Sequence, residues 1–422
     1  MKYKARFTRL VVCLIVATLA VSVIGIVGLA QEKVTLEMWS WRPEDADVYP
    51  EILAAFESTH PNIDVVFKPF KNTEYPSVLL TSLEAGEGPD IMQLKSYGGL
   101  QAYTKYLKAL DGDIPALEGF TKSALSGARG REDNVIYGVP FATQGLGIYY
   151  NTKIFEQHGI SEPRTWDEFL AVCQELQDNG VMPLANGGKD GWTLEVVFAV
   201  VGPAFYGATD FYNAVTAGDT TFEDPAFVRA LEKTLELKPY MPPGFMGVGY
   251  QDQRALFYNE QAAMCLAGAW EIGGFKRENP NLEFGIFAGP PEAEGEIAYI
   301  SSFTDGSYGM NKNTSHPAET LEFMTFLTSL EFGQPFTDLL AQLSCVPGIA
   351  CSDPQLNTFI ELSANATPYI TLCGFRWEIP SGSVIIQGRL QEMFQGSLSP
   401  EEVASQLQEA MEEWYKPFQN GS

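Results

Sequence analysis

The residues of this chain that could do binding chemistry are tryptophans beside glycine, proline or polar residues. An indole face covers the apolar C–H face of a sugar ring, and neighbouring amides, carboxylates and cations hydrogen-bond its hydroxyl groups. Five of the seven tryptophans have this context, and they are Trp39, Trp41, Trp192, Trp270 and Trp377. Core packing would explain any one of them, but the set favours a carbohydrate site. Trp166 and Trp414 lie within predicted helices and are assigned to packing.

Motifs for catalysis, metal binding or a cofactor are absent from the sequence. There is no G-x-S-x-G, H-E-x-x-H, C-x-x-C or P-loop pattern. The three histidines, His60, His158 and His316, are far apart. The 53 acidic residues could supply the carboxylate pair of a glycosidase, but no pair stands out. Binding without chemistry is therefore predicted, with no catalytic residue, metal site or cofactor, and a secreted carbohydrate-active hydrolase is the alternative.

The charge of the chain excludes other classes of partner. Acidic residues outnumber basic ones by 53 to 27, which gives a net charge of −26. Such a chain is repelled by phosphate backbones, polyanions and anionic lipid surfaces. No nucleic-acid partner is predicted.

The first thirty residues have the pattern of an export signal. Four basic residues stand among the first nine, and Leu10 to Ala30 is uncharged. A small-x-small sequence ends at Ala30, which predicts a signal peptide over residues 1–30 that is cleaved before Gln31. The alternative is an uncleaved anchor, because the uncharged run is long enough to span a bilayer. Both place the rest of the chain outside the cytoplasm, in the periplasm or at the outer face of the membrane.

Two cysteines leave a question of pairing open. Cys345 and Cys351 flank a short loop that a disulfide could close in an oxidising compartment, whereas the alternative is buried free thiols.

The elements that would position the tryptophans alternate between strands and helices. Apolar alternation predicts strands at 34–38, 63–67 and 91–94, and helical spacing predicts helices at 48–56 and 75–85. Connections of this kind are right-handed crossovers in a parallel sheet. Ligands bind beyond the carboxyl ends of such strands, which selects Trp39, Trp41 and residues 95–97.

The same alternation recurs later in the chain. Further strands are predicted at 145–150, 262–266 and 308–310, and further helices at 165–178, 317–330 and 400–414. Thr165 and Glu168 form a capping box at the start of one helix. Without heptads, short repeats or a low-complexity linker, the pattern favours two α/β lobes over a string of domains.

A series of short motifs runs along nearly the whole chain after residue 30. They are Met38-Trp39-Ser40-Trp41, Phe56 with His60-Pro61-Asn62-Ile63, Gly88-Pro89-Asp90-Ile91, Tyr137-Gly138-Val139-Pro140, Ile148-Tyr149-Tyr150-Asn151, Thr165-Trp166-Asp167-Glu168-Phe169, residues 187–192, Gly268-Ala269-Trp270 and residues 323–327. Each motif is weak alone. In this order and spacing the chain resembles the bacterial extracellular solute-binding proteins of family 1, the carbohydrate receptors of ABC importers, and is similar to the maltose- and oligosaccharide-binding members.

The resemblance implies a two-lobe α/β fold of the type II periplasmic-binding-protein kind. Each lobe would be a mostly parallel sheet flanked by helices, with the ligand in the interlobe cleft. Residues 31–140 and 306–345 would form lobe 1, and residues 141–305 and 346–422 lobe 2. The chain would cross between the lobes near 140–144, 302–306 and 343–348.

The resemblance also implies which residues bind the ligand. Trp270 corresponds to the family's stacking aromatic residue. The full expected set is Trp39, Trp41, Tyr97, Gln144, Lys189, Asp190, Trp192, Trp270, Asp305, Arg376 and Trp377. Lys95, Ser96 and Tyr97 stand where the maltose-binding pattern has a charged pair, so maltose itself is not predicted.

The expected function is that of a monomeric extracytoplasmic receptor. It would capture a neutral mono- or oligosaccharide by hinge closure and deliver it to the permease subunits of an ABC importer. A receptor for a polyamine is a third alternative, suggested by the acidity of the chain. Lys189 and Arg376 argue against it, because a polyamine cleft should combine aromatic residues with several carboxylates.

Overall fold

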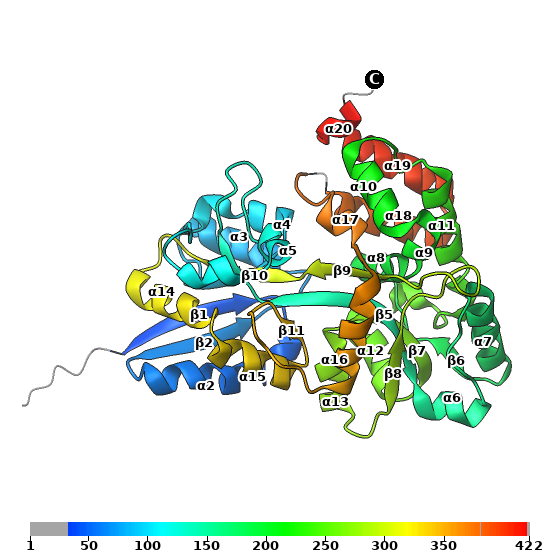
Figure 1. Cartoon of the computed structure of the whole chain (residues 1–422), viewed down its shortest axis with the longest axis horizontal. Coiled ribbons are helices and arrows are strands. Elements are labelled where there is room, and N and C mark those ends of the chain that lie inside the picture. Colours follow the sequence, from blue (N-terminus) through cyan, green and yellow to red (C-terminus); the bar gives the residue numbers. More distant parts are fainter. Residues whose placement is uncertain (1–32, 380, 420–422) are drawn as a thin grey trace, which may run out of the picture.

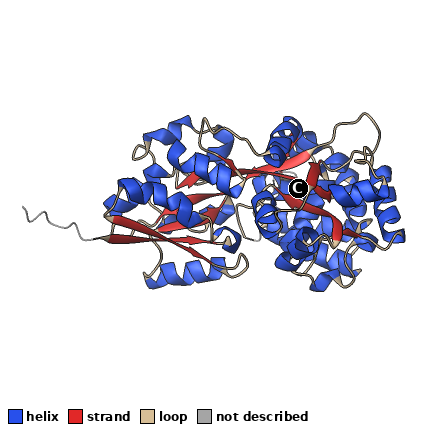
Figure 2. Cartoon of the chain, turned by 90° about the horizontal axis from the view of Figure 1, so that it is seen from below, coloured by secondary structure: helices blue, strands red, loops and turns tan. Residues whose placement is uncertain are grey.

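The computed structural model describes residues 33–379 and 381–419. They form two lobes, each built around its own sheet, with helices packed against the sheets (Figures 1 and 2). The predicted signal peptide or anchor at 1–30 lies outside the described residues. Among the helices of the described residues, none is long and apolar enough to cross a membrane.

The first lobe contains the sheet with strand order β2-β1-β3-β10-β4. Its elements are β1 (Val34–Ser40), α2 (Tyr49–Thr59), β2 (Ile63–Pro69), α3 (Tyr75–Ala85), β3 (Ile91–Lys95), α4 (Gly98–Gln101), α5 (Lys122–Ser126), β4 (Gly138–Pro140), β10 (Gly306–Met310), α14 (Pro317–Phe326) and α15 (Leu330–Leu340). Strand β1 runs parallel to β2 and β3, as the crossover pattern predicts, and β10 runs antiparallel to β3 and β4.

Helix α2 shows why the early elements could be predicted from sequence. Ile52, Leu53 and Phe56 share one face and are buried in the core of the first lobe. The helix ends at Thr59, where His60 leaves the helical conformation just before Pro61. The predicted helix at 317–330 is shorter than expected, because α14 ends at Phe326 and the Ser329 hydroxyl caps a new helix, α15.

The second lobe contains the sheet with strand order β12-β9-β5-β7-β6, and β8 and β11 also pair with β5. Its elements are β5 (Ala142–Asn151), α6 (Thr152–His158), α7 (Trp166–Asp178), β6 (Met182–Leu184), α8 (Gly191–Val201), α9 (Pro203–Tyr206), α10 (Ala208–Ala217), α11 (Pro225–Leu235), α12 (Tyr250–Tyr258), β7 (Ala262–Gly268), α13 (Glu271–Glu278), β8 (Phe284–Phe287), β9 (Ile300–Thr304), β11 (Leu343–Ser344), α16 (Pro354–Leu362), β12 (Ala366–Pro368), α17 (Ile370–Cys373), α18 (Gly382–Gln395), α19 (Pro400–Glu412) and α20 (Lys416–Gln419).

The expectation of a mostly parallel sheet is wrong for the second lobe. Strand β5 is antiparallel to β7, β8, β9 and β11, and only the β6–β7 and β9–β12 pairs in the described residues are parallel. The reason is the direction of the chain. Strand β5 leaves the first lobe and runs outward, whereas β7 and β9 run back toward it.

In the described part of the chain, the backbone passes between the two sheets at three points. Phe141 separates β4 from β5, Asp305 separates β9 from β10, and residues 341–342 separate α15 from β11. The first two lie within the predicted segments, and the third precedes the predicted one. The crossings are hydrogen-bonded to one another, since Asp305 N donates to Ala142 O (2.9 Å) and Cys345 N donates to Phe141 O (2.9 Å).

Candidate ligand-binding site

A cavity of about 390 Å³ lies between the lobes and takes its lining from both. The first lobe contributes residues at or just beyond the carboxyl ends of β1, β2 and β3, including Trp41 after β1 and Lys95 at the end of β3. The second lobe contributes the loop before α8, the start of α12 and Trp270, which follows β7. The carboxyl ends of strands therefore meet at the cavity, as expected for an open α/β sheet.

Aromatic side chains of the second lobe form a continuous wall of this cavity. The Trp192 ring lies 4.7 Å from Tyr250 and 6.4 Å from Trp270, measured between ring centroids. Phe303 continues the series, 6.4 Å from Trp270 and 5.4 Å from Tyr369. Trp41 lines the cavity from the first lobe, supported by Phe141 at 5.9 Å. Such surfaces suit the apolar faces of sugar rings.

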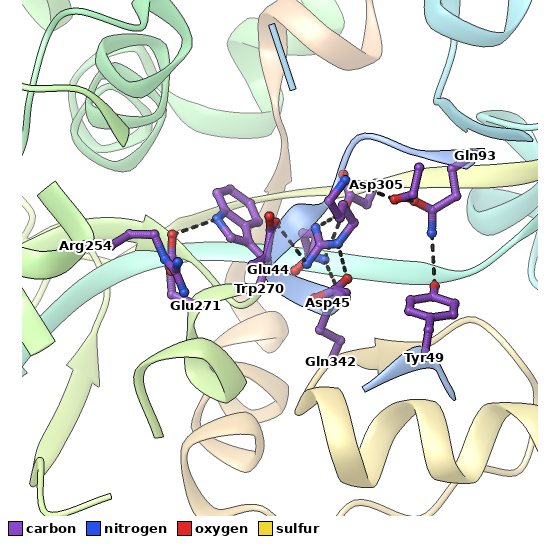
Figure 3. A network of polar contacts seen from close by, with 12 residues as sticks. Glu44, Asp45, Tyr49, Gln93, Arg254, Trp270, Glu271, Asp305 and Gln342 are labelled. Carbon is purple, nitrogen blue, oxygen red and sulfur yellow. Dashed lines mark hydrogen bonds and ion pairs between the residues drawn. The ribbon is translucent and has the colours of Figure 1, made fainter. Parts of the chain in front are cut away.

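Trp270 is held in place by the elements on either side of it. Strand β7 ends at Gly268, and a Cβ atom added there would lie 2.0 Å from the indole, so the ring rests directly over this glycine. The indole Nε1 donates to Glu271 Oε1 (3.2 Å), and Arg254 Nε donates to Glu271 Oε2 (2.7 Å), as Figure 3 shows. The small residue and the buried ion pair fix the ring before ligand arrives.

Charged groups of opposite sign balance one another around the cavity. Among the described residues, the cations that line it are Arg42, Lys71, Lys95, Lys189 and Arg376, and the carboxylates are Glu44, Asp190, Glu195, Asp252 and Asp305. The site is formally neutral although the chain carries −26. A neutral ligand with many hydroxyl groups fits such a lining better than a polycation does.

Several of these carboxylates are bonded to protein groups. Glu195 accepts hydrogen bonds from Thr371 (2.5 Å), Ser383 (2.9 Å) and Gln387 (2.6 Å), and burial raises its pKa. Burial also raises the pKa of Asp305, which accepts from Arg42 Nη1 (3.3 Å). The bonded carboxylates orient neighbouring donors rather than presenting free charge.

Two other groups have pKa values close to neutrality. Burial, together with the nearby Arg376 guanidinium, lowers the pKa of Lys95 to about 7, and its Nζ donates to Asn72 Oδ1 (2.7 Å). Burial raises the pKa of Glu44 to about 7. Both side chains can therefore change protonation state in the physiological range.

The structure brings most of the predicted site residues together. Those that line the cavity are Trp41, Lys189, Asp190, Trp192, Trp270, Asp305 and Arg376. Trp192 stands on the first turn of α8, a largely apolar helix whose sequence has no amphipathic period.

The other four predicted residues lie outside the cavity lining. Trp39 is still within β1, where it packs on Phe70 at 4.9 Å and Nε1 donates to Glu37 (2.7 Å). Gln144 is buried at the hinge. Tyr97 and Trp377 meet edge to face at 5.2 Å and join the two lobes beside the cavity.

Several lining residues were missed by reasoning from sequence, notably Arg42, Glu44, Glu195 and Tyr250. Lys95 was selected by the strand-end rule but was left out of the expected binding set. Arg42 and Glu44 follow Trp41 beyond the end of β1, so the strand-end rule could have found them. Glu195 also left a signal, because it is a lone charge in the apolar sequence of α8. Tyr250 left none.

Comparison with known proteins identifies the family. The family model of the bacterial extracellular solute-binding proteins matches residues 40–332. The chain belongs to this family. Among the relatives of this solute-binding protein is the multiple sugar-binding protein of Streptococcus mutans, 26% identical over 338 residues, which are 76% of this chain and 77% of the relative.

Solved structures share the fold of this solute-binding protein. A chitin oligosaccharide binding protein superposes with a TM-score of 0.77 at 24% identity, covering 91% of this chain and 99% of its own. The binding protein RafE in complex with raffinose gives a TM-score of 0.74 at 20% identity, covering 92% and 100%. The predicted two-lobe α/β fold of type II is confirmed.

Proposed function

We propose that this solute-binding protein is the extracytoplasmic receptor of an ABC importer and captures a neutral mono- or oligosaccharide. The observation that carries this proposal is the aromatic wall of Trp192, Tyr250 and Trp270 in a cavity whose lining charges balance. The relative from Streptococcus mutans is named a sugar-binding protein, and the RafE structure contains raffinose. Both support a sugar as the ligand class.

The receptor would work by closure of the lobes on its ligand. A sugar that contacts both lobes binds the closed state more tightly and shifts the population toward it. We propose that residues 31–140 and 306–345 move as lobe 1, and residues 141–305 and 346–422 as lobe 2. The crossings at Phe141 and Asp305 support the first two boundaries, whereas the pairing of β11 (Leu343–Ser344) with β5 of the second lobe supports a third boundary at 341–342.

The partners follow from this role. The receptor would be exported by its N-terminal segment, act as a monomer, and pass the sugar to transmembrane permease subunits. It would perform no chemistry and need no cofactor. Glu195 and Asp305 accept hydrogen bonds from protein donors, so neither carboxylate is free to act on a substrate. These hydrogen bonds support binding without catalysis.

The test is a thermal-shift screen of the purified protein without its first thirty residues against neutral mono- and oligosaccharides. A ligand at a hundredfold excess over its Kd stabilises the folded state by about 2.7 kcal/mol. At least one sugar should raise the melting temperature, and the bound oligosaccharide should be recovered intact. Shifts caused only by amino acids or polyamines would overturn the sugar ligand. Sustained release of reducing ends, abolished by Glu44→Gln, would establish the hydrolase instead.

A further inference from the structure

A buried series of polar contacts connects the cavity to the hinge. Arg42 lines the cavity, and its side chain is only 4% exposed. Its Nη1 donates to Asp305 Oδ2 (3.3 Å) at the second crossing, and its Nε donates to Asp45 Oδ2 (2.5 Å). Figure 3 labels both of these carboxylates. The guanidinium therefore touches the ligand space on one side and a crossing on the other.

The series continues through the remaining crossings. Gln144, just after the first crossing, donates from Nε2 to Asp305 Oδ2 (3.2 Å) and to Gln342 Oε1 (3.0 Å). Gln342 belongs to the third crossing, and it does not line the cavity. A side chain at or near each crossing is thus joined to the others, and through Asp305 to Arg42. We call Arg42, Gln144, Asp305 and Gln342 the hinge relay.

The hinge relay is incompletely satisfied. In the described part of the chain, seven buried side-chain N or O atoms have no hydrogen-bond partner, and three belong to the relay: Arg42 Nη2, Gln144 Oε1 and Gln342 Nε2. The carboxylate oxygen paired with Arg42 Nη2, Glu44 Oε1, is 3.7 Å away, beyond hydrogen-bonding distance. Unpartnered buried polar atoms cost free energy, so an arrangement that pairs them is favoured.

We propose that Arg42 is a positioning residue that couples ligand binding to the hinge: the bound sugar packs on the part of the side chain that lines the cavity, while Nη1 holds Asp305. This inference rests on the proposed function. A sugar packed against this side chain fixes the plane of the guanidinium, which is rigid, and so fixes the bond from Nη1 to Asp305. The free amide atoms of Gln144 and Gln342 give the crossings alternative hydrogen bonds as the lobes rotate. The ligand thereby selects one arrangement of all the crossings.

The experiment separates affinity from closure. Sugar affinity is measured by calorimetry, and the radius of gyration is measured by small-angle scattering without sugar and at saturation. The variant is Arg42→Gln. Its matched control is Lys189→Gln, because Lys189 lines the cavity from the second lobe but makes no hydrogen bond or ion pair with the relay in the described residues. A second variant, Gln342→Met, cuts the relay outside the cavity.

Arg42→Gln should weaken affinity by about tenfold and reach less than half of the wild-type contraction at saturation. Lys189→Gln should bind more weakly yet contract fully once saturated. Gln342→Met should contract less than wild type although its cavity lining is intact. If Arg42→Gln does not fold, the contraction of Gln342→Met alone tests the proposal. Full contraction of both relay variants at saturation would overturn the proposal.

The ligand-free profiles keep this result separate from the proposed function. Cutting the relay should change the radius of gyration of Gln342→Met even without sugar, whereas Lys189→Gln should match the wild type. Identical ligand-free profiles for wild type and both relay variants would count against the relay. Absence of sugar binding by the wild type itself would instead remove the proposed function.

Discussion

Trp270 takes its orientation from Gly268 below the ring and from Glu271 at its edge, and it packs on the margin of the second-lobe core rather than inside it. We expect Trp270→Ala to lose about 2–4 kcal/mol of sugar affinity, as aromatic hot spots do. Its ligand-free melting temperature should stay near that of the wild type, because the ring is only partly buried. Calorimetry and thermal unfolding of the same preparation measure both quantities.

Trp166→Ala provides the matched control for this prediction. Trp166 is 1% exposed in the core of the second lobe, so its removal should cost about 3–5 kcal/mol of stability. If Trp270→Ala melts as early as Trp166→Ala yet binds sugar normally, Trp270 is a core residue and not part of the site.

Lys95 should make stability depend on pH. Its pKa is lowered from 10.5 in the unfolded chain to about 7 in the folded protein. The stability it contributes is therefore present above pH 10.5 and is lost as the pH falls through about 7, because the buried ammonium must then be accommodated. We expect the gain in unfolding free energy of Lys95→Met over wild type to grow between pH 10 and pH 7. Urea denaturation across this range measures it.

Glu44 should make the stability depend on pH in the opposite direction to Lys95. The pKa of Glu44 is raised from 4.5 to about 7, so the stability that it contributes is lost as the pH rises through that interval. The advantage of Glu44→Gln over wild type should grow from pH 4.5 to pH 7. Differences that stay constant with pH for both variants would show that neither group is perturbed by burial.

At the scale of elements, α4 of the first lobe approaches the segment after α17 of the second through a glycine. A Cβ atom added at Gly98 would lie 1.5 Å from the carbonyl oxygen of Arg376, and backbone cannot retreat as a side chain can. We expect Gly98→Ala to hold the lobes apart, which should increase the radius of gyration at sugar saturation and weaken affinity. Scattering with saturating sugar measures the first effect.

Gly388→Ala, in the middle of α18, is the matched substitution. A Cβ atom there meets nothing within 4 Å, so alanine should stabilise the helix by about 0.5–1 kcal/mol and leave closure unchanged. Equal radii for Gly98→Ala and wild type at saturation would mean that this approach of the lobes is not needed for closure.

Elements with a clear period were predictable from sequence, and those without one were not. Apolar and polar residues alternate at the start of strand β1, and helix α2 has one apolar face, so the local sequence pattern predicts both elements. Helix α8 is buried on nearly all sides and shows no such period. The antiparallel pairing around β5 was also hidden, because strand direction depends on where the chain crosses between lobes.

The site residues also divide into those that a local sequence pattern identifies and those that it does not. Trp41 and Trp270 follow strand ends and were identified, whereas Tyr250 reaches the cavity from the start of a helix that no motif marks. Gln144 was expected at the cleft and is instead buried beneath it. A strand-end rule finds the edge at which ligands bind, but the depth of each side chain depends on packing that only the folded chain defines.

For the whole molecule, closure should be independent of metal ions. No group of three or more histidine, cysteine, aspartate or glutamate side chains in residues 33–379 and 381–419 could hold one. We expect saturating sugar to reduce the radius of gyration equally with and without a chelator. Contraction that requires a divalent cation would show that an ion, and not the sugar alone, bridges the lobes.

The clustering of Trp41, Trp192 and Trp270 at the cavity also has an optical consequence. A neutral sugar has no chromophore, but it displaces solvent from indole rings and so changes their emission. Trp377, which meets Tyr97 across the lobes, senses a different event, the approach of one lobe to the other. Trp166 stays in the core and supplies a constant background. Intrinsic fluorescence can therefore follow occupancy and lobe approach as separate signals, with single tryptophan-to-phenylalanine substitutions assigning each to its ring.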